Sequence, residues 1–131
     1  MTNTLKDNLI MAQTEANRIL IDCQNKYAFS DIRVKVKHLR RGHSRYKTRL
    51  TSIPLWAYGK GEAFFTYYVL HEISHIINYD TEGSERGHSE DFKQIEKTLL
   101  KDYGLIPIYK RAYIKALKDI NGVIRYKEHN V

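Results

Sequence analysis

The chain has 131 residues, a hydrophobic content of 42% and a formal net charge of +7 at pH 7. This size and apolar content predict one compact domain over 1–131, with a core large enough to fold alone. No segment is apolar enough to span a membrane, the N-terminus lacks the hydrophobic stretch of a signal peptide and Cys23 is a single cysteine, so we expect a cytoplasmic protein that is a monomer by default.

The predicted elements begin with an amphipathic helix over 3–26, which should back a small sheet. In 31–40, apolar residues alternate with Arg33, Lys35 and Lys37, which is the period of a half-buried strand. The alternation continues in 45–55, and the intervening RRGHS predicts a hairpin turn. These segments predict a mainly antiparallel sheet.

The predicted hairpin is strongly basic. From Ile32 to Gly61 there are nine lysines and arginines and no acidic residue, so the hairpin should carry a positive face. The basic residues assigned to its exposed side and tip are Arg33, Lys35, Lys37, Arg40, Arg41, Arg45, Lys47 and Arg49. Such a face can hold the phosphates of a nucleic acid or an acidic partner. The alternative is a solvated strand surface whose lysines discourage edge aggregation, and no recognised base-reading motif accompanies the charge.

Pro54 indicates that the second strand ends at a sheet edge, where a missing backbone donor costs little. An edge strand can align an extended peptide by strand addition, which makes 45–55 a candidate substrate shelf. An ordinary hairpin that covers the core is the other interpretation.

The next predicted element is a buried helix that contains HEISH, residues 71–75. Positions i and i+4 share one helix face, so His71 and His75 can reach one metal ion, while Glu72 points toward a water on that metal. Two core histidines bonded to backbone carbonyls would give the same spacing. The metal site is favoured because Glu72 would otherwise be a buried carboxylate without a partner.

A hydrolytic zinc usually has three protein ligands and one water. The polar stretch 80–87 predicts a loop, after which His88 stands at the start of a helix with Ser89 as its capping residue. His88 is the best third ligand and Asp80 is the main rival, whereas Glu96 should face water beside two lysines. Further rivals are Glu82, Glu85 and Asp91.

After Gly104 the pattern around Asn121 and Gly122 predicts a C-terminal β-hairpin, although 110–119 is also compatible with a helix.

HEISH, a polar loop and GHSEDF at the head of a second helix resemble the SprT-like and related minimal zincin metallopeptidases. The resemblance covers about 45–104, and Ser89 departs from it by standing where glycine is frequent. It implies an α+β minimal zincin-like domain, His71, His75 and His88 as ligands of one Zn²⁺ per chain, and Glu72 as the general base.

The predicted function is therefore zinc-dependent hydrolysis of a peptide bond in a protein or peptide substrate, in which Glu72 moves the proton of a zinc-activated water. The resemblance further implies substrates associated with nucleic acid. The alternative is a non-catalytic nucleic-acid-binding or regulatory protein with a structural zinc. The oxyanion-stabilising residue stays unassigned among ten tyrosines.

Overall fold

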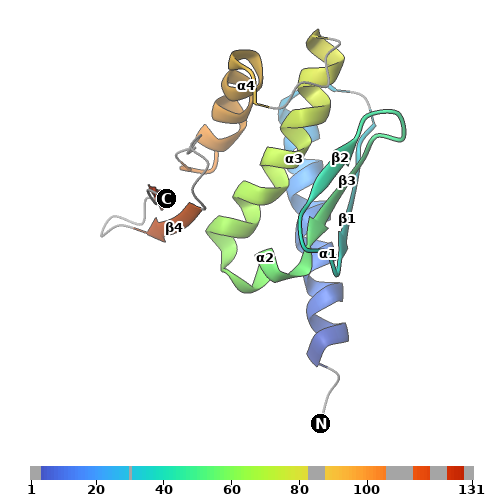
Figure 1. Ribbon diagram of the computed structural model, residues 1–131, viewed down its shortest axis with the longest axis vertical. Helices are drawn as coiled ribbons and strands as arrows, with labels where there is room; N and C mark the ends of the chain where they lie inside the picture. The colour runs from blue at the N-terminus through green and yellow to red at the C-terminus, as the bar shows by residue number, and fades with distance from the viewer. Residues whose placement is uncertain (1–3, 30, 83–87, 106–113, 119–123, 129–131) are drawn as a thin grey trace.

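The computed structural model describes residues 4–29, 31–82, 88–105, 114–118 and 124–128, which form an α+β arrangement, as the sequence predicts (Figure 1). The helices are α1 (Thr4–Lys26), α2 (Leu55–Gly59), α3 (Glu62–Glu82) and α4 (Glu90–Lys101). The strands are β1 (Arg33–Lys37), β2 (His43–Arg45), β3 (Leu50–Pro54), β4 (Ile114–Lys118) and β5 (Ile124–Glu128).

Helix α3 is the central element of the fold. It contacts α1, α2 and α4 as well as β2 and β3, and in Figure 1 it lies between α4 and the three-stranded sheet. Four of its apolar side chains, Val69, Leu70, Ile73 and Ile76, are fully buried. The middle of this helix, which contains HEISH, is therefore enclosed by other elements, as the sequence predicts.

The three-stranded sheet differs from the predicted hairpin. Its strand order is β1-β3-β2, in which β1 and β3 are parallel and β2 and β3 are antiparallel. The segment RRGHS is not a turn, because its last two residues begin β2. Since β3 is the middle strand, 45–55 is not an edge strand, and Pro54 instead ends β3 and occupies the position directly before α2.

The chain reverses after β2, within the segment that the alternation assigned to a strand. Arg49 adopts a φ of 58°, which turns the chain back so that β3 runs alongside β1. Tyr46 stacks on Tyr79, with ring centroids 4.8 Å apart, instead of continuing the strand. The turn residues after β2 alternate between apolar or neutral and basic side chains, as strand residues do. The alternation therefore assigned them wrongly to a strand.

The N-terminal helix, α4 and the C-terminal strands agree with the sequence, whereas the short helix α2 was not predicted. Ser89 caps α4 by accepting a hydrogen bond from the backbone N–H of Phe92 at 3.2 Å. Strands β4 and β5 pair as an antiparallel hairpin, while the predicted turn at Asn121 and Gly122 lies outside the described residues. Within the described residues, no helix combines the length and apolar character needed to cross a bilayer.

Candidate metal centre

Three histidines from two elements converge on one point. His71 and His75 lie one turn apart on α3, and His88 directly precedes the cap of α4. One ring nitrogen of each lies within 4.8 Å of the other two, and the Nε2 atoms of His71 and His88 are 3.2 Å apart. The three residues that the sequence predicts as ligands therefore form a group that could hold a metal ion.

Glu96 of α4 contacts this histidine group through the ring nitrogen of His71 that points away from the other imidazoles. It is fully buried, and one of its carboxylate oxygens bonds to Nδ1 of His71. The prediction that Glu96 faces water is wrong, because the turn of α4 that carries it packs on α3 and leaves Lys93 and Lys97 nearer the surface. A carboxylate on Nδ1 fixes the ring orientation and directs Nε2 toward the other imidazoles.

Phe92 forms an apolar wall beside the imidazoles. Its ring is buried and stacks on His75 at a centroid distance of 4.3 Å, and it also contacts His71 and His88 at 5.2 and 4.9 Å. Tyr67 lies one turn before His71, with its hydroxyl 3.4 Å from Nδ1. These aromatic side chains restrict the rotamers of the imidazoles and so preorganise their nitrogens.

Electrostatics keep two of the imidazoles neutral. Burial, together with the neighbouring His71 and His88, lowers the pKa of His75 to about 3. Burial and His71 also lower the pKa of His88. For His71, burial lowers the pKa, but the hydrogen bond to Glu96 and the charges of Glu96 and Glu72 outweigh it, so the pKa is raised. Neutral imidazoles are the form that binds metals.

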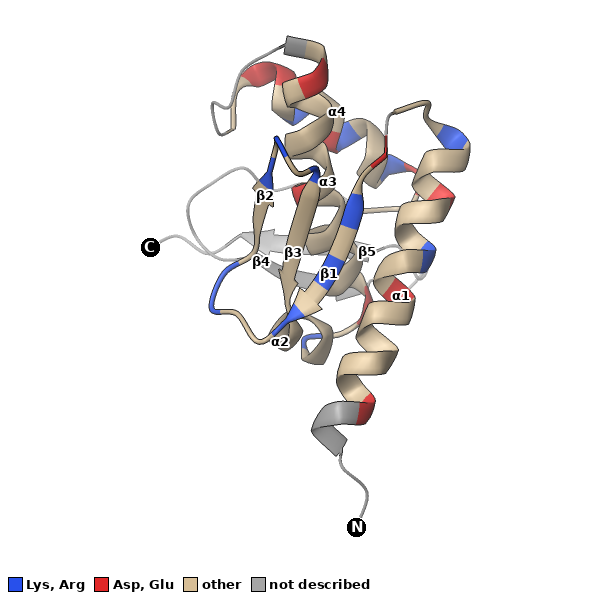
Figure 2. Cartoon of the chain, turned by 90° about the vertical axis from the view of Figure 1, so that its right-hand side faces the viewer, with Lys and Arg blue, Asp and Glu red and all other residues tan. Residues whose placement is uncertain are grey.

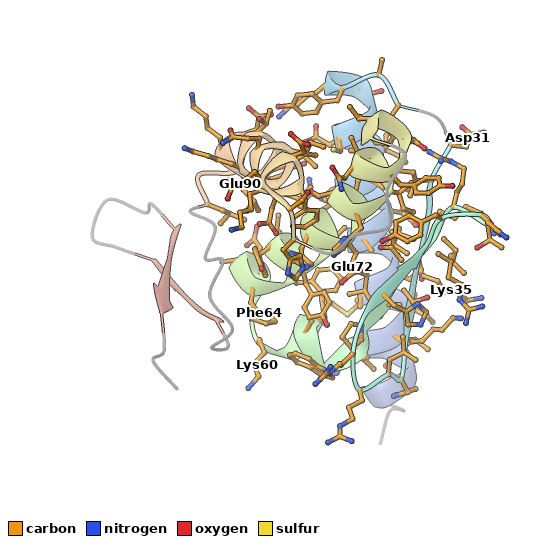
Figure 3. The ribbon with its side chains drawn as sticks, turned by 45° about the horizontal axis from the view of Figure 1, so that its top comes forward. Asp31, Lys35, Lys60, Phe64, Glu72 and Glu90 are labelled. Carbon is orange, nitrogen blue, oxygen red and sulfur yellow. The ribbon has the colours of Figure 1, made fainter. Side chains whose placement is uncertain are left out.

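Glu72 lies on the side of α3 that faces the strands and is 5% exposed (Figure 3). Its Oε1 accepts a hydrogen bond from the hydroxyl of Ser44 in β2 at 2.9 Å. Burial raises the pKa of Glu72, although His71 and the Ser44 hydrogen bond act in the opposite direction. A buried carboxylate with a neutral donor is a stronger base than one paired with a cation.

The donor set fits zinc. Two nitrogens that each lie about 2.0–2.1 Å from a tetrahedral zinc are about 3.3–3.4 Å apart, close to the separation of the His71 and His88 nitrogens. That separation also fits a hydrogen bond between the two rings. A metal is indicated more strongly by the third imidazole, His75, together with the carboxylate that orients His71.

The rivals for the third ligand lie elsewhere or are not described. Asp80 accepts hydrogen bonds from both terminal nitrogens of Arg49, each at 2.7 Å. Asp91 is exposed in the first turn of α4. Glu85 and the side chain of Glu82 lie outside the described residues. Among the described residues, the group of histidine and carboxylate donors that can hold a metal is His71, His75 and His88.

Most of the predicted basic residues are exposed. Lysines and arginines mark β1, the connection to β2 and β2 itself, and none of these strands carries an acidic residue (Figure 2). The exposed ones are Arg33, Lys35, Arg40, Arg41, Arg45 and Lys47, whereas Lys37 is half-buried. Arg49 is the exception, because its side chain turns to Asp80 and is 24% exposed.

Two residues at the site, Glu96 and Ser44, were missed, and of these only Glu96 leaves a signal in the sequence. Phe92 and Glu96 are four residues apart and share the face of α4 that meets α3, and His88 stands four residues before Phe92, just ahead of the helix cap. The two neighbouring lysines obscured this spacing. Ser44 has no such signal, since its contact with Glu72 depends on the β2–β3 pairing.

Comparisons with protein families, with curated proteins and with solved structures find no match for this chain.

Proposed function

We propose that the protein is a zinc-dependent metallopeptidase of the minimal zincin type, similar to SprT-like enzymes. The observation that carries this proposal is the convergence of three histidines beside a buried glutamate whose carboxylate is held by a neutral hydroxyl. A structural zinc needs ligands but has no use for a carboxylate next to the first of them. Glu72 is 5% exposed, and its carboxylate accepts a hydrogen bond from a neutral hydroxyl.

His71, His75 and His88 would hold the metal, with Glu96 fixing the ring of His71 through Nδ1. When bound, zinc would lower the pKa of a coordinated water and polarise the substrate carbonyl as a Lewis acid. Glu72 would accept the proton of the attacking water and pass it to the leaving amine. Burial favours this role because it raises the pKa of Glu72 toward the range in which a base can also return a proton.

The sheet edge next to Glu72 is the substrate shelf in this proposal. Within the described residues, β2 pairs with β3 on one side and with no strand on the other. Ser44, the middle residue of β2, contacts Glu72, so a peptide added along this edge would lie beside the catalytic carboxylate. The shelf is therefore β2 rather than 45–55.

The experiment that tests the proposal is Glu72→Gln, with Glu62→Gln as the matched control. Glu62 is an exposed residue in the first turn of the same helix. Cleavage of an unstructured protein substrate such as casein should be lost with Glu72→Gln, while stoichiometric zinc and the melting temperature are retained. The control should cleave like the wild type. Equal cleavage by the wild type and Glu72→Gln would refute the assignment of the base.

A second candidate function is nucleic-acid contact through the basic face, which would bring the peptidase to nucleic-acid-associated proteins. It is favoured by the exposed Arg33, Lys35 and Arg45 on strands without acidic residues. Charge reversal at Lys35, Lys37, Arg45 and Lys47 should abolish DNA binding and its salt dependence without affecting zinc. DNA binding that survives these four changes would remove this candidate, and DNA binding without any cleavage would favour a non-catalytic protein.

A further inference from the structure

The hydroxyl of Ser44 makes the one hydrogen bond that the Glu72 carboxylate accepts within the described part of the chain. The single hydroxyl proton of Ser44 is shared in a three-centre hydrogen bond between Oε1 of Glu72, at 2.9 Å, and the main-chain oxygen of the same residue, at 2.7 Å. Ser44 is half-buried and Glu72 is buried, so water competes weakly for this contact. The orientation of the carboxylate thus depends on one side chain from the sheet.

The place of Ser44 is set by contacts on both sides of it. Strand pairing aligns Ser44 with Thr51, and residues aligned in a sheet point to the same face, here the face toward α3. Before it, the backbone N–H of Gly42 donates to the Tyr68 hydroxyl at 2.8 Å. A side chain at Gly42 would not fit, because its Cβ would lie 2.5 Å from the Tyr68 ring. Ser44 is therefore held beside Glu72 independently of the bond between them.

A hydroxyl suits this place better than a charged donor. It can fix one carboxylate oxygen, while a lysine or arginine would also neutralise the negative charge and weaken the base. With Oε1 engaged by Ser44, Oε2 has no hydrogen-bond donor among the described residues and can accept a proton. Effective general-base catalysis requires the carboxylate to be held in this way, because small errors of orientation lower the rate.

We propose that Ser44 is the positioning residue for the general base, in that its hydroxyl holds the Glu72 carboxylate in the orientation for proton transfer. This inference rests on the proposed peptidase function. It assigns a second role to β2, since the strand that would receive the substrate would also orient the base. Ser44 does not touch the reacting atoms, so its effect should appear in kcat and not in KM.

The test compares Ser44→Ala, Ser44→Thr and the control Ser52→Ala. Ser52 is a buried serine on the neighbouring strand whose hydroxyl has no hydrogen-bond partner within the described residues. Ser44→Ala should lower kcat about tenfold to a hundredfold, which is part of what a general base contributes, with KM and zinc content unchanged. Ser44→Thr keeps the hydroxyl and should restore most of kcat, and Ser52→Ala should match the wild type.

A second readout does not need the loaded enzyme. In the metal-free protein, the NMR signal of the Glu72 side-chain carboxyl carbon should shift with Ser44→Ala and return toward its wild-type position with Ser44→Thr. It should not move with Ser52→Ala. A merely structural role of Ser44 would leave this signal in place, so an unchanged signal overturns the proposal.

The kinetic outcomes separate this proposal from the function on which it rests. If Glu72→Gln loses cleavage while Ser44→Ala keeps the wild-type kcat, Ser44 is not a positioning residue and the peptidase stands. If Ser44→Ala raises KM alone, Ser44 belongs to substrate binding and the proposal is wrong. If Glu72→Gln cleaves like the wild type, the peptidase function fails first. Ser44→Ala should cause no further loss in the Glu72→Gln background, and an additional loss would also overturn the proposal.

Discussion

Helix α3 carries two acidic side chains that meet the sheet segment, and they are held in opposite ways. Asp80, near the end of the helix, accepts a hydrogen bond on each oxygen from the guanidinium of Arg49 at 2.7 Å. Glu72, two turns earlier, has one hydrogen-bond donor among the described residues, the neutral hydroxyl of Ser44. Both contacts join α3 to the chain around β2, yet Asp80 is paired with a cation through both oxygens, whereas Glu72 is buried beside a neutral donor.

The partners of these two carboxylates distinguish a structural carboxylate from one that can take part in a reaction. A carboxylate that already has a bidentate arginine gains nothing by accepting a proton or a metal. A buried carboxylate with a neutral donor retains its basicity, and proteins keep such a group where it is used. By this criterion Asp80 stabilises the turn after β2 through Arg49, and Glu72 together with the three histidines forms the candidate metal centre.

The largest expected effect comes from removing the third imidazole. His88→Ala should weaken zinc binding by more than the tenfold to hundredfold that loss of a supporting hydrogen bond costs, because a direct ligand is missing. Asp80→Asn is the matched control and should bind zinc like the wild type. Metal analysis after dialysis against a chelator measures both. Zinc retained by His88→Ala but lost from Asp80→Asn would reverse the comparison.

A smaller effect is expected at Glu96, which acts on the metal through His71. Glu96→Gln should lower zinc affinity about tenfold to a hundredfold, because the amide orients Nδ1 of His71 without the charge that favours metal binding. Lys97→Gln, an exposed change on the adjacent position, should have no effect. Competition with a fluorescent chelator gives the affinities. Equal affinities for the two variants would show that Glu96 is a structural residue only.

The ion pair between Asp80 and Arg49 should affect stability and not activity. Asp80→Asn should lower the free energy of unfolding by about 1 kcal/mol, since the pair with Arg49 is bidentate but partly exposed to solvent. Zinc content and kcat should not change. Urea unfolding of the metal-free protein measures the first and casein cleavage the second. A loss of cleavage at full zinc content would give Asp80 a functional part that the bidentate pair does not suggest.

These contrasts also show what the sequence can predict. The three long helices and the grouping of the three histidines were predictable because both depend on short-range spacing, in which i and i+4 share a face and a serine caps the next helix. The class of the fold and the strand at Arg33–Lys37 followed from the same local periodicities. Local patterns were sufficient wherever one element determined the outcome.

The sheet topology and the partners of Glu72 and His71 were not predictable in this way. They depend on which segments meet, as when Arg49 turns the chain at a φ of 58° so that β3 lies between β1 and β2. Ser44 reaches Glu72 across 28 residues, and Glu96 reaches His71 across 25. From the sequence alone, a charged or polar residue is assigned to the solvent-exposed surface. Only the tertiary structure shows a buried partner.

The smallest expected effect concerns Cys23, which tests whether burial alone marks a functional group. Like Glu72, it is buried, and burial together with nearby aspartates raises its pKa to about 12. Unlike Glu72, it lies in the apolar cluster that α1 shares with the sheet and α3, away from the imidazoles. A thiol whose pKa rises from 9.0 to about 12 has roughly a thousandfold less thiolate near pH 8.

Iodoacetamide at pH 8 should therefore leave Cys23 unmodified in the folded protein and alkylate it fully in urea, as read by mass spectrometry. Alkylation of the folded protein at the rate of the unfolded chain would mean that α1 opens readily or that Cys23 is activated. The expected inertness supports the distinction drawn from α3: burial raises the pKa of both groups, but Glu72 also has an orienting hydroxyl and three imidazoles nearby, and that combination is what makes a buried acid useful.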